Sequence, residues 1–185
     1  MTPKPWVIMR SDWVVDAHWY RLRKDVVQLP DGRIVDDYFV SVRPDVAIMV
    51  PIDRDGQMIL VRQYKHGIGS ICLEFPAGTF QDGRESAEAA ARRELMEETG
   101  YRPGRVQPLG VAIEDATRNS NRVHMFLALD CERAGEQTLD ENEQSSGVEV
   151  VRLPLATLRE TLNTGAIAAM SSLVAGYRAL DRIGG

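Results

Sequence analysis

Three glutamates lie close together near the middle of the chain, in a segment with the pattern of a helix. Glu94, Glu97 and Glu98 are spaced i, i+3 and i+4, so on an α-helix they share one face. We therefore expect these carboxylates to point inward or into a cleft rather than into open water, because small apolar residues typical of a packed helix face precede them on the same side. These small residues are Ala87, Ala90 and Ala91.

Clustered carboxylates in such a place need a positive partner. They repel one another, and burial of an unpaired charge is costly. A site with oxygen ligands alone favours a hard divalent cation over zinc. The sequence therefore predicts a site for Mg²⁺ or Mn²⁺. The alternative is a solvated acidic helix face, stabilised by i,i+4 pairs such as Arg93 with Glu97.

The ends of this helix are clearly marked. Ser86 is a good N-cap, Glu88 lies in the first turn where the helix dipole favours an acid, and Gly100 follows as the C′ residue. Glu85 and Arg93 lie on the other side of the helix. There we expect them to hold the helix against the glycine loop that precedes it.

This segment resembles the signature of the Nudix hydrolases. The family pattern is a glycine, a short loop, a glutamate, seven residues, and then Arg-Glu-apolar-x-Glu-Glu-x-Gly-apolar, which here runs from Gly78 through Glu85 to Tyr101. The loop between Gly78 and Glu85 has six residues where the family has five. The resemblance implies that Glu94, Glu97 and Glu98 bind the metal together with the Ala77 carbonyl. It also implies that Glu98 and Arg93 belong to the catalytic set.

The resemblance extends over nearly the whole chain and is closest to the ADP-ribose pyrophosphatase branch, the nucleoside diphosphate sugar hydrolases. In that branch an acidic loop reaches over the metals and supplies a glutamate that acts on the attacking water. The matching cluster here contains Glu141 and Glu143, and Glu143, or failing that Glu141, is our candidate base. By itself, an acidic loop of this kind is usually a solvated surface.

Several basic residues and one glycine are candidates for substrate binding. Arg62 and Lys65 end a strand just before the glycine loop, and the resemblance matches Lys65 to a residue that holds the diphosphate. Solvated charges at a strand end are the alternative for both. His124 lies in an apolar strand and is interpreted as a core histidine. The remaining candidates are Arg43, Gly78 and Arg118. Arg43 resembles a position that touches the substrate in relatives. Arg118, together with Asn119, Ser120 and Asn121, suits the distal sugar of the substrate, and this loop departs from the family pattern.

Composition limits the kind of protein. The chain has 185 residues, 44% of them hydrophobic and 26% charged, which suits one globular domain with a sizeable core. A net charge of −5 argues against binding to a nucleic-acid backbone. Cys72 and Cys131 are expected to be free thiols, and no leader or apolar run of membrane-spanning length is visible. We therefore expect a cytoplasmic protein that binds no membrane.

The pattern of elements predicts an α+β protein. Two β-rich runs, residues 18–29 and 34–42, surround a Pro-Asp-Gly turn and form a hairpin. Later strands alternate with a few helices, which indicates an α/β/α sandwich with a mixed central sheet, as in the Nudix fold. We expect two domains, an N-terminal β-rich dimerisation segment (1–43) and a Nudix hydrolase domain (44–185). The hairpin exposes much apolar surface, and relatives exchange this segment between subunits, so a homodimer is expected. Its apolar residues include Trp6, Trp13, Trp19 and Tyr20.

The predicted function is metal-dependent hydrolysis of the diphosphate in a small-molecule nucleotide sugar. The first candidate is ADP-ribose, cleaved to AMP and ribose 5-phosphate, with GDP-mannose or another nucleotide sugar as the alternative. A non-catalytic Nudix-fold sensor that binds ADP-ribose, or a structural protein with a coincidental motif, remains a rival from another class.

Overall fold

The computed structural model describes residues 2–80 and 83–184, which form two compact units. The small unit contains the described residues up to Pro44 together with Ile113–Asn121. The large unit contains Asp45–Ala112 and the described residues from Arg122 onward. The predicted boundary between residues 43 and 44 lies beside Pro44. Ile113–Asn121, which we had expected to belong to the second domain, groups with the small unit.

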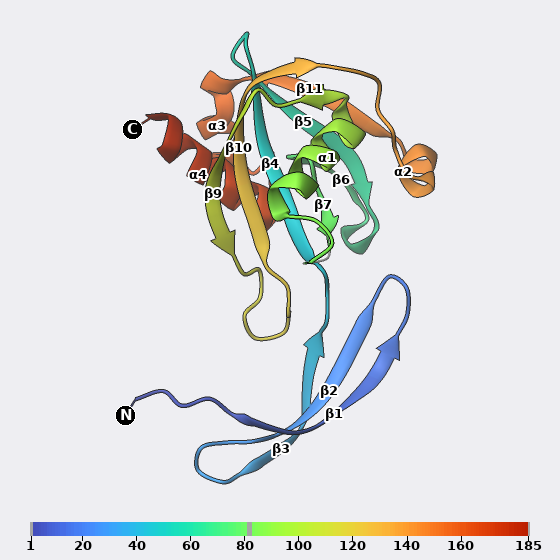
Figure 1. The fold of residues 1–185 in the computed structure, drawn as a ribbon, viewed down its shortest axis with the longest axis vertical. Coiled ribbons are helices and arrows are strands. Elements are labelled where there is room, and N and C mark those ends of the chain that lie inside the picture. Colours follow the sequence, from blue (N-terminus) through green and yellow to red (C-terminus); the bar gives the residue numbers. More distant parts are fainter. Residues whose placement is uncertain (1, 81–82, 185) are drawn as a thin grey trace. The chain divides into compact units, whose positions relative to one another are not determined.

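The large unit is built on a mixed sheet whose central strand is β4 (Asp45–Asp53) (Figure 1). On one side β4 pairs in parallel with β10 (Val123–Arg133), and on the other it is antiparallel to β5 (Gln57–Lys65). The antiparallel strand β11 (Val148–Pro154) follows β5. The sheet is completed by β6 (Ser70–Glu74) on β5, β7 (Ala77–Phe80) on β4, and β8 (Tyr101–Arg102) and β9 (Arg105–Ala112) on β10.

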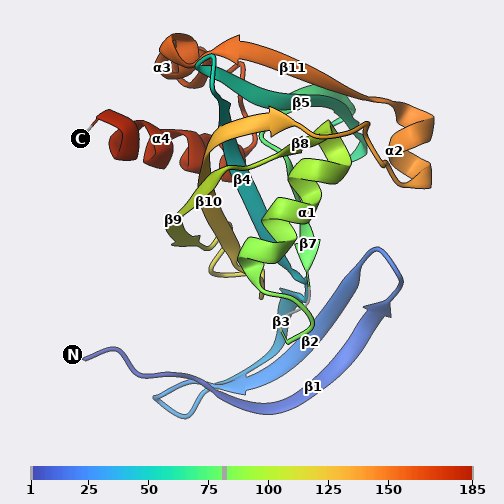
Figure 2. The same cartoon turned by 45° about the horizontal axis from the view of Figure 1, so that its top comes forward.

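Helices cover both faces of this sheet, so the predicted sandwich is confirmed (Figure 2). Side chains alternate along β4: Ala47 and Met49 pack under α1 (Ala87–Thr99), whereas Ile48 and Val50 pack into the opposite core. That second core includes residues of α3 (Leu158–Asn163) and α4 (Met170–Gly184). Two short 3₁₀ turns, η1 (His66–Ile68) and η2 (Leu155–Thr157), also belong to this unit.

The small unit is an antiparallel sheet in the order β1 (Val7–Asp16), β2 (Arg21–Gln28) and β3 (Ile34–Ser41). The predicted hairpin is β2 and β3, and β1 is an additional strand. Its buried polar centre is Asp25, which accepts a hydrogen bond from Ser11 Oγ (2.6 Å) and is paired with Arg23 (2.8 Å).

One further helix lies where the sequence indicated only an acidic loop. This is α2 (Glu141–Ser146). Asp140 caps it, accepting hydrogen bonds from the backbone N–H groups of Asn142 and Glu143 (both 2.8 Å). Glu143 Oε2 in turn accepts from the Asp140 N–H (2.9 Å), which completes a capping box. No helix in the described part of the chain is long and apolar enough to cross a membrane.

Candidate active site

Helix α1 has the ends that its sequence predicted. Ser86 Oγ accepts a hydrogen bond from the Ala89 N–H (3.1 Å), and Gly100 adopts a left-handed conformation (φ 73°) with its N–H bonded to the Met96 carbonyl (2.8 Å). Both ends are therefore fixed. This sets the rotation of the helix and so the direction in which its glutamates point.

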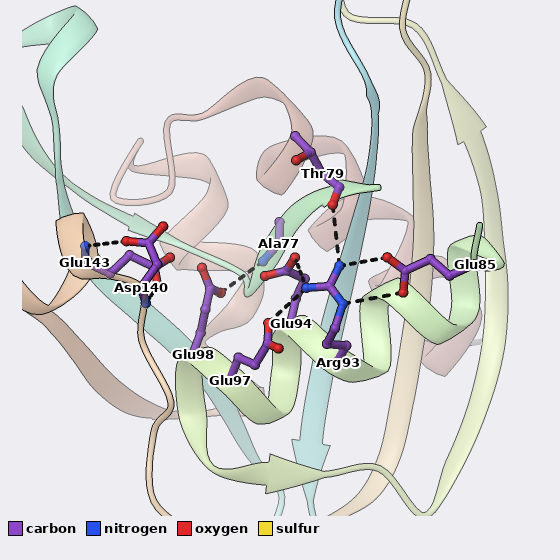
Figure 3. Close-up of polar contacts among 9 residues, drawn as sticks. All are labelled: Ala77, Thr79, Glu85, Arg93, Glu94, Glu97, Glu98, Asp140 and Glu143. Atoms are coloured by element: carbon purple, nitrogen blue, oxygen red, sulfur yellow. Dashed lines mark hydrogen bonds and ion pairs between the residues drawn. The ribbon is translucent and has the colours of Figure 1, made fainter. Parts of the chain in front are cut away.

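The Arg93 side chain forms hydrogen bonds with three glutamates of the site (Figure 3). Its guanidinium donates to Glu94 Oε1 (2.7 Å) and Glu97 Oε2 (2.9 Å) on one side and to Glu85 Oε1 (2.9 Å) on the other. The bonds to Glu85 are the largest influence on Arg93, whose pKa is raised above its ordinary value. The expected Glu85–Arg93 pairing is therefore present, and Arg93 also contacts two predicted metal ligands. Residues 81 and 82 of the longer loop lie outside the described residues.

Glu98 is the most buried of the three glutamates, with 2% of its surface exposed. Its Oε2 accepts a hydrogen bond from the backbone N–H of Ala77 in β7 (3.1 Å) (Figure 3). Burial, reinforced by the nearby charge of Glu94, raises the pKa of Glu98 to about 8, against this hydrogen bond. Burial also raises the pKa of Glu94, although Arg93 opposes the shift. Both groups are therefore destabilised as anions unless a cation approaches them.

Gly78 makes room for the Glu94 carboxylate. A Cβ on Gly78 would overlap the carboxylate of Glu94 itself, so no other residue fits here without displacing that group. The glycine of the motif thus allows β7 to approach α1 closely, and it brings the Ala77 and Gly78 backbone beside the carboxylates.

The residues at this position suit a hard divalent cation. The donor set consists of oxygen atoms only, and two of its carboxylates are largely buried next to a glycine that leaves them space. Among the described residues, no three acidic, histidine or cysteine side chains already surround a common point. Arg93 binds Glu94 and Glu97, while Glu98 binds the Ala77 N–H.

Of the two candidate bases, Glu143 is the one whose charge is among the main influences on the cluster. Glu143 is among the main groups that raise the pKa of Glu94 and of Glu98, after burial, whereas Glu141 is not among them for either group. Glu143 is also the residue whose carboxylate closes the capping box of α2. This helix therefore holds Glu143 at its first turn.

The two cations at the end of β5 are separated by the sheet. Lys65 pairs with Glu74 (Nζ to Oε2, 2.9 Å), and its charge acts on Glu98. Arg62 pairs with Glu149 of β11 (2.8 Å) and, by strand alternation, points to the opposite face. The structure therefore places Lys65 with the carboxylates and does not bring Arg62 to them.

Arg43 and Arg118 lie in the small unit, where both line a cavity of about 420 Å³. Arg43 is 3.6 Å from Glu114, and the Arg118 carbonyl accepts a hydrogen bond from the Ser41 N–H (2.7 Å). The cavity thus combines cationic, aromatic and polar side chains. Its other lining residues are Trp19, Tyr20, Leu22, Phe39, Ser41, Asp115 and Asn119.

Three residues of the site went unrecognised in the sequence. Glu74 forms the Lys65 ion pair, and Gln137 donates to the carbonyls of Glu98 (2.6 Å) and Val148 (3.0 Å). No local pattern marks either residue. Asp140 could have been found, because Asp140 followed three residues later by Glu143 is a capping-box pattern. As expected, His124 is a structural residue, with Nε2 3.2 Å from Asp45.

The sequence profile of the NUDIX domain matches residues 42–172, and that of the nucleoside diphosphate sugar hydrolase N-terminal domain matches residues 6–41. An ADP-sugar pyrophosphatase of Mus musculus is 64% identical over 111 residues, covering 55% of this chain and 50% of that protein. An ADP-ribose pyrophosphatase of Bacillus subtilis is 32% identical over 125 residues, covering 67% and 66%. A GDP-mannose pyrophosphatase of Pectobacterium atrosepticum is 31% identical over 168 residues, covering 83% of each chain.

Among solved structures, an ADP compounds hydrolase superposes with a TM-score of 0.86 at 22% identity, covering 100% of this chain and 97% of its own. That likeness concerns the fold. The chain spans between about a quarter and two thirds of the length of the first curated relatives that it matches. Because the NUDIX profile covers most of the chain and includes the carboxylate helix, this chain belongs to the Nudix hydrolase family.

Proposed function

We propose that this chain hydrolyses the diphosphate of nucleoside diphosphate sugars in a metal-dependent reaction, with ADP-ribose giving AMP and ribose 5-phosphate. Nudix hydrolases generally use divalent metal ions. We propose Mg²⁺ or Mn²⁺ here, because every candidate ligand is an oxygen. The observation that carries the proposal is the buried carboxylate pair of Glu94 and Glu98 beside Ala77 and Gly78.

In this proposal the candidate site residues of the large unit have different roles. Glu94, Glu98 and the Ala77 carbonyl hold the cation, with help from Glu97. When bound, the cation supplies positive charge against the diphosphate oxygens. The Lys65 ammonium donates hydrogen bonds to the same diphosphate. Glu143 accepts the proton of the attacking water.

The cavity of the small unit suits a nucleobase. Trp19 and Tyr20 offer aromatic faces, Arg43 and Arg118 offer guanidinium planes, and Asn119 offers a donor and an acceptor. The names of the relatives include both ADP- and GDP-linked substrates. We therefore propose that an adenosine diphosphate sugar is the first substrate and that GDP-mannose is its main competitor.

We also propose that the small unit joins two chains into a homodimer. All ten residues of β1 are exposed, including Val7 (57%), Met9 (59%) and Val14 (52%). An exposed apolar edge strand is a ready surface for pairing with another chain. The proposed partner of this strand is therefore a second copy of the same chain.

Separation of substrate and products by ion-exchange chromatography tests the reaction, because AMP and ribose 5-phosphate elute apart from intact ADP-ribose. The assay should include ADP-ribose, ADP-glucose, GDP-mannose and ATP, each with Mg²⁺, with Mn²⁺ and with a chelator. We expect metal-dependent cleavage of ADP-ribose. Tight ADP-ribose binding without turnover would identify a sensor, and strong preference for ATP would reject the substrate class.

A further inference from the structure

Lys65 and Glu74 are paired along one face of the hairpin formed by β5 and β6. Each ends its own strand, and because the strands are antiparallel Lys65 is opposite Ser70 while Glu74 is opposite Val61. The two residues are therefore far apart in the register of the hairpin. Their 2.9 Å ion pair requires both side chains to lean toward each other along the face.

Gln63 lies between the two charges and approaches the same oxygen. Its Nε2 is 3.5 Å from Glu74 Oε2. By strand alternation Gln63 and Lys65 share a face with Ile59, which packs into the core under α1. The ion pair is therefore on the face of the sheet that carries the carboxylates of α1. The influence of Lys65 on the pKa of Glu98, which opposes the larger effect of burial, agrees with this placement.

Glu74 has no part in the chemistry described above, yet it is the more buried partner. Its side chain is 14% exposed, compared with 42% for Lys65. A lysine has a long flexible stem, so an unrestrained ammonium samples many positions. An ammonium also has three donors, so one bond to Glu74 leaves two for anionic oxygens.

We propose that Glu74 is a positioning residue that holds the Lys65 ammonium toward the carboxylate cluster, where its two remaining donors bind the diphosphate of the substrate. This inference rests on the proposed function. Because the ion pair orders the lysine when the protein folds, less side-chain freedom is lost when the substrate binds. Glu74 therefore acts through Lys65 and not on the substrate itself.

A double-mutant cycle tests this dependence. Glu74→Gln removes the charge but keeps the shape, and Lys65→Met removes the ammonium but keeps most of the stem. We expect Glu74→Gln to lower kcat/KM for ADP-ribose about tenfold, mainly through KM, since hydrogen bonds to charged groups are among the stronger ones. In the Lys65→Met background the same change should alter kcat/KM by less than about twofold, because no ammonium remains to be positioned.

Two further variants separate positioning from stability. Glu74→Asp keeps the charge and should retain an intermediate kcat/KM. Asp53→Asn is the matched control, because Asp53 is also mostly buried and paired with an arginine, Arg152, but is the last residue of β4, just before the turn into β5. It should lower the melting temperature without changing KM.

The cycle is repeated for binding of α,β-methylene-ADP, a diphosphate that cannot be cleaved at its bridge, by calorimetry with Mg²⁺. The same non-additivity in Kd is expected. If no nucleotide sugar is cleaved but the binding cycle is non-additive, the proposed reaction fails and the positioning role stands. The role is overturned if Glu74→Gln has no effect, if it has the same effect in both backgrounds, or if Lys65→Met changes neither binding nor activity.

Discussion

The two units of this protein differ in how their side chains are buried. The large unit has a packed core on each face of its sheet, and fully buried residues such as Met49 and Leu60 lie on opposite sides. In the described part of the small unit Val27 is the only buried apolar residue. A three-stranded sheet with so small a core is marginally stable at best.

This difference in burial indicates that the two units have different roles. The carboxylates lie in the unit that has its own rigid core, which suits groups that must be held in exact positions. The cavity with Trp19 and Arg43 lies in the unit that needs additional burial. Changes in the large unit should therefore alter the rate with the fold intact, whereas changes in the small unit should alter assembly and substrate choice.

The largest expected effect is the loss of turnover in Glu98→Gln. Removal of this proposed metal ligand and its charge should lower kcat by about three orders of magnitude, because electrostatic stabilisation of the transition state is lost. The fold should survive, since neutralising one of several mutually repelling carboxylates does not weaken packing. Steady-state kinetics with Mg²⁺ and a thermal melt measure the two parts. Near-normal activity in this variant would remove Glu98 from the metal site.

The next effect concerns the base. Glu143→Gln should slow kcat by about a hundredfold or more, the usual cost of losing a general base. Glu141→Gln is the matched control on the same turn of α2, and it should change kcat by only a few-fold. Rates at saturating substrate decide between them. If neither variant slows by more than a few-fold, the base lies on α1 instead.

A charge on the exposed edge of the small unit should weaken assembly. Val14→Lys places an ammonium in the apolar surface of β1, so the dimer dissociation constant should rise at least tenfold. Val111→Lys on β9 is the control, because Val111 (47% exposed) is about as exposed as Val14 (52%) but lies in the large unit. Light scattering over a dilution series measures the mass. A wild-type monomer at micromolar concentration would contradict the dimer.

The raised pKa of Glu98 predicts a pH-dependent stability in the absence of metal. Between its ordinary value of 4.5 and its folded value of about 8, this carboxyl keeps its proton in the folded protein but loses it on unfolding. The free energy of unfolding should therefore fall as the pH rises through this window, with a slope from this group of at most ~1.4 kcal/mol per pH unit. Denaturant titrations of wild type and Glu98→Gln measure the difference, which added Mg²⁺ should abolish. Parallel profiles would contradict it.

The sequence predicted α1 and its ends well because their signals are local. Ser86, Gly100 and the spacing of Glu94 and Glu98 can each be read within a few residues. The short helix α2 was missed because all six of its residues are polar, so no apolar periodicity marks it, even though the Asp140–Glu143 pattern was present. Contacts between residues that are far apart in the sequence could not be predicted in this way.

Two features show why distant pairing could not be predicted. Ile113–Asn121 groups with the small unit through contacts such as the bridge between Ser41 and Asn119. The ion pair of Lys65 and Glu74 depends on how far each side chain leans along its strand. Neither contact leaves a periodic pattern in a single sequence. The role of the loop at residues 118–121, which we expected from the sequence to contact the distal sugar, was hard to predict for the same reason.

The smallest expected effect tests which part of the substrate the loop with Asn119 contacts. Arg118 and Asn119 line the same cavity as Arg43 and Tyr20, so we now expect Asn119 to contact the nucleobase instead of the distal sugar. Asn119→Ala should change the ratio of kcat/KM between ADP-ribose and GDP-ribose by the equivalent of ~1 to 3 kcal/mol, because it removes one specific polar partner of the base. The ratio between ADP-ribose and ADP-glucose, which differ only in the sugar, should stay constant. A change confined to the sugar ratio would return this loop to its first assignment, and an equal loss for all three substrates would show that Asn119 supports the loop without selecting the base.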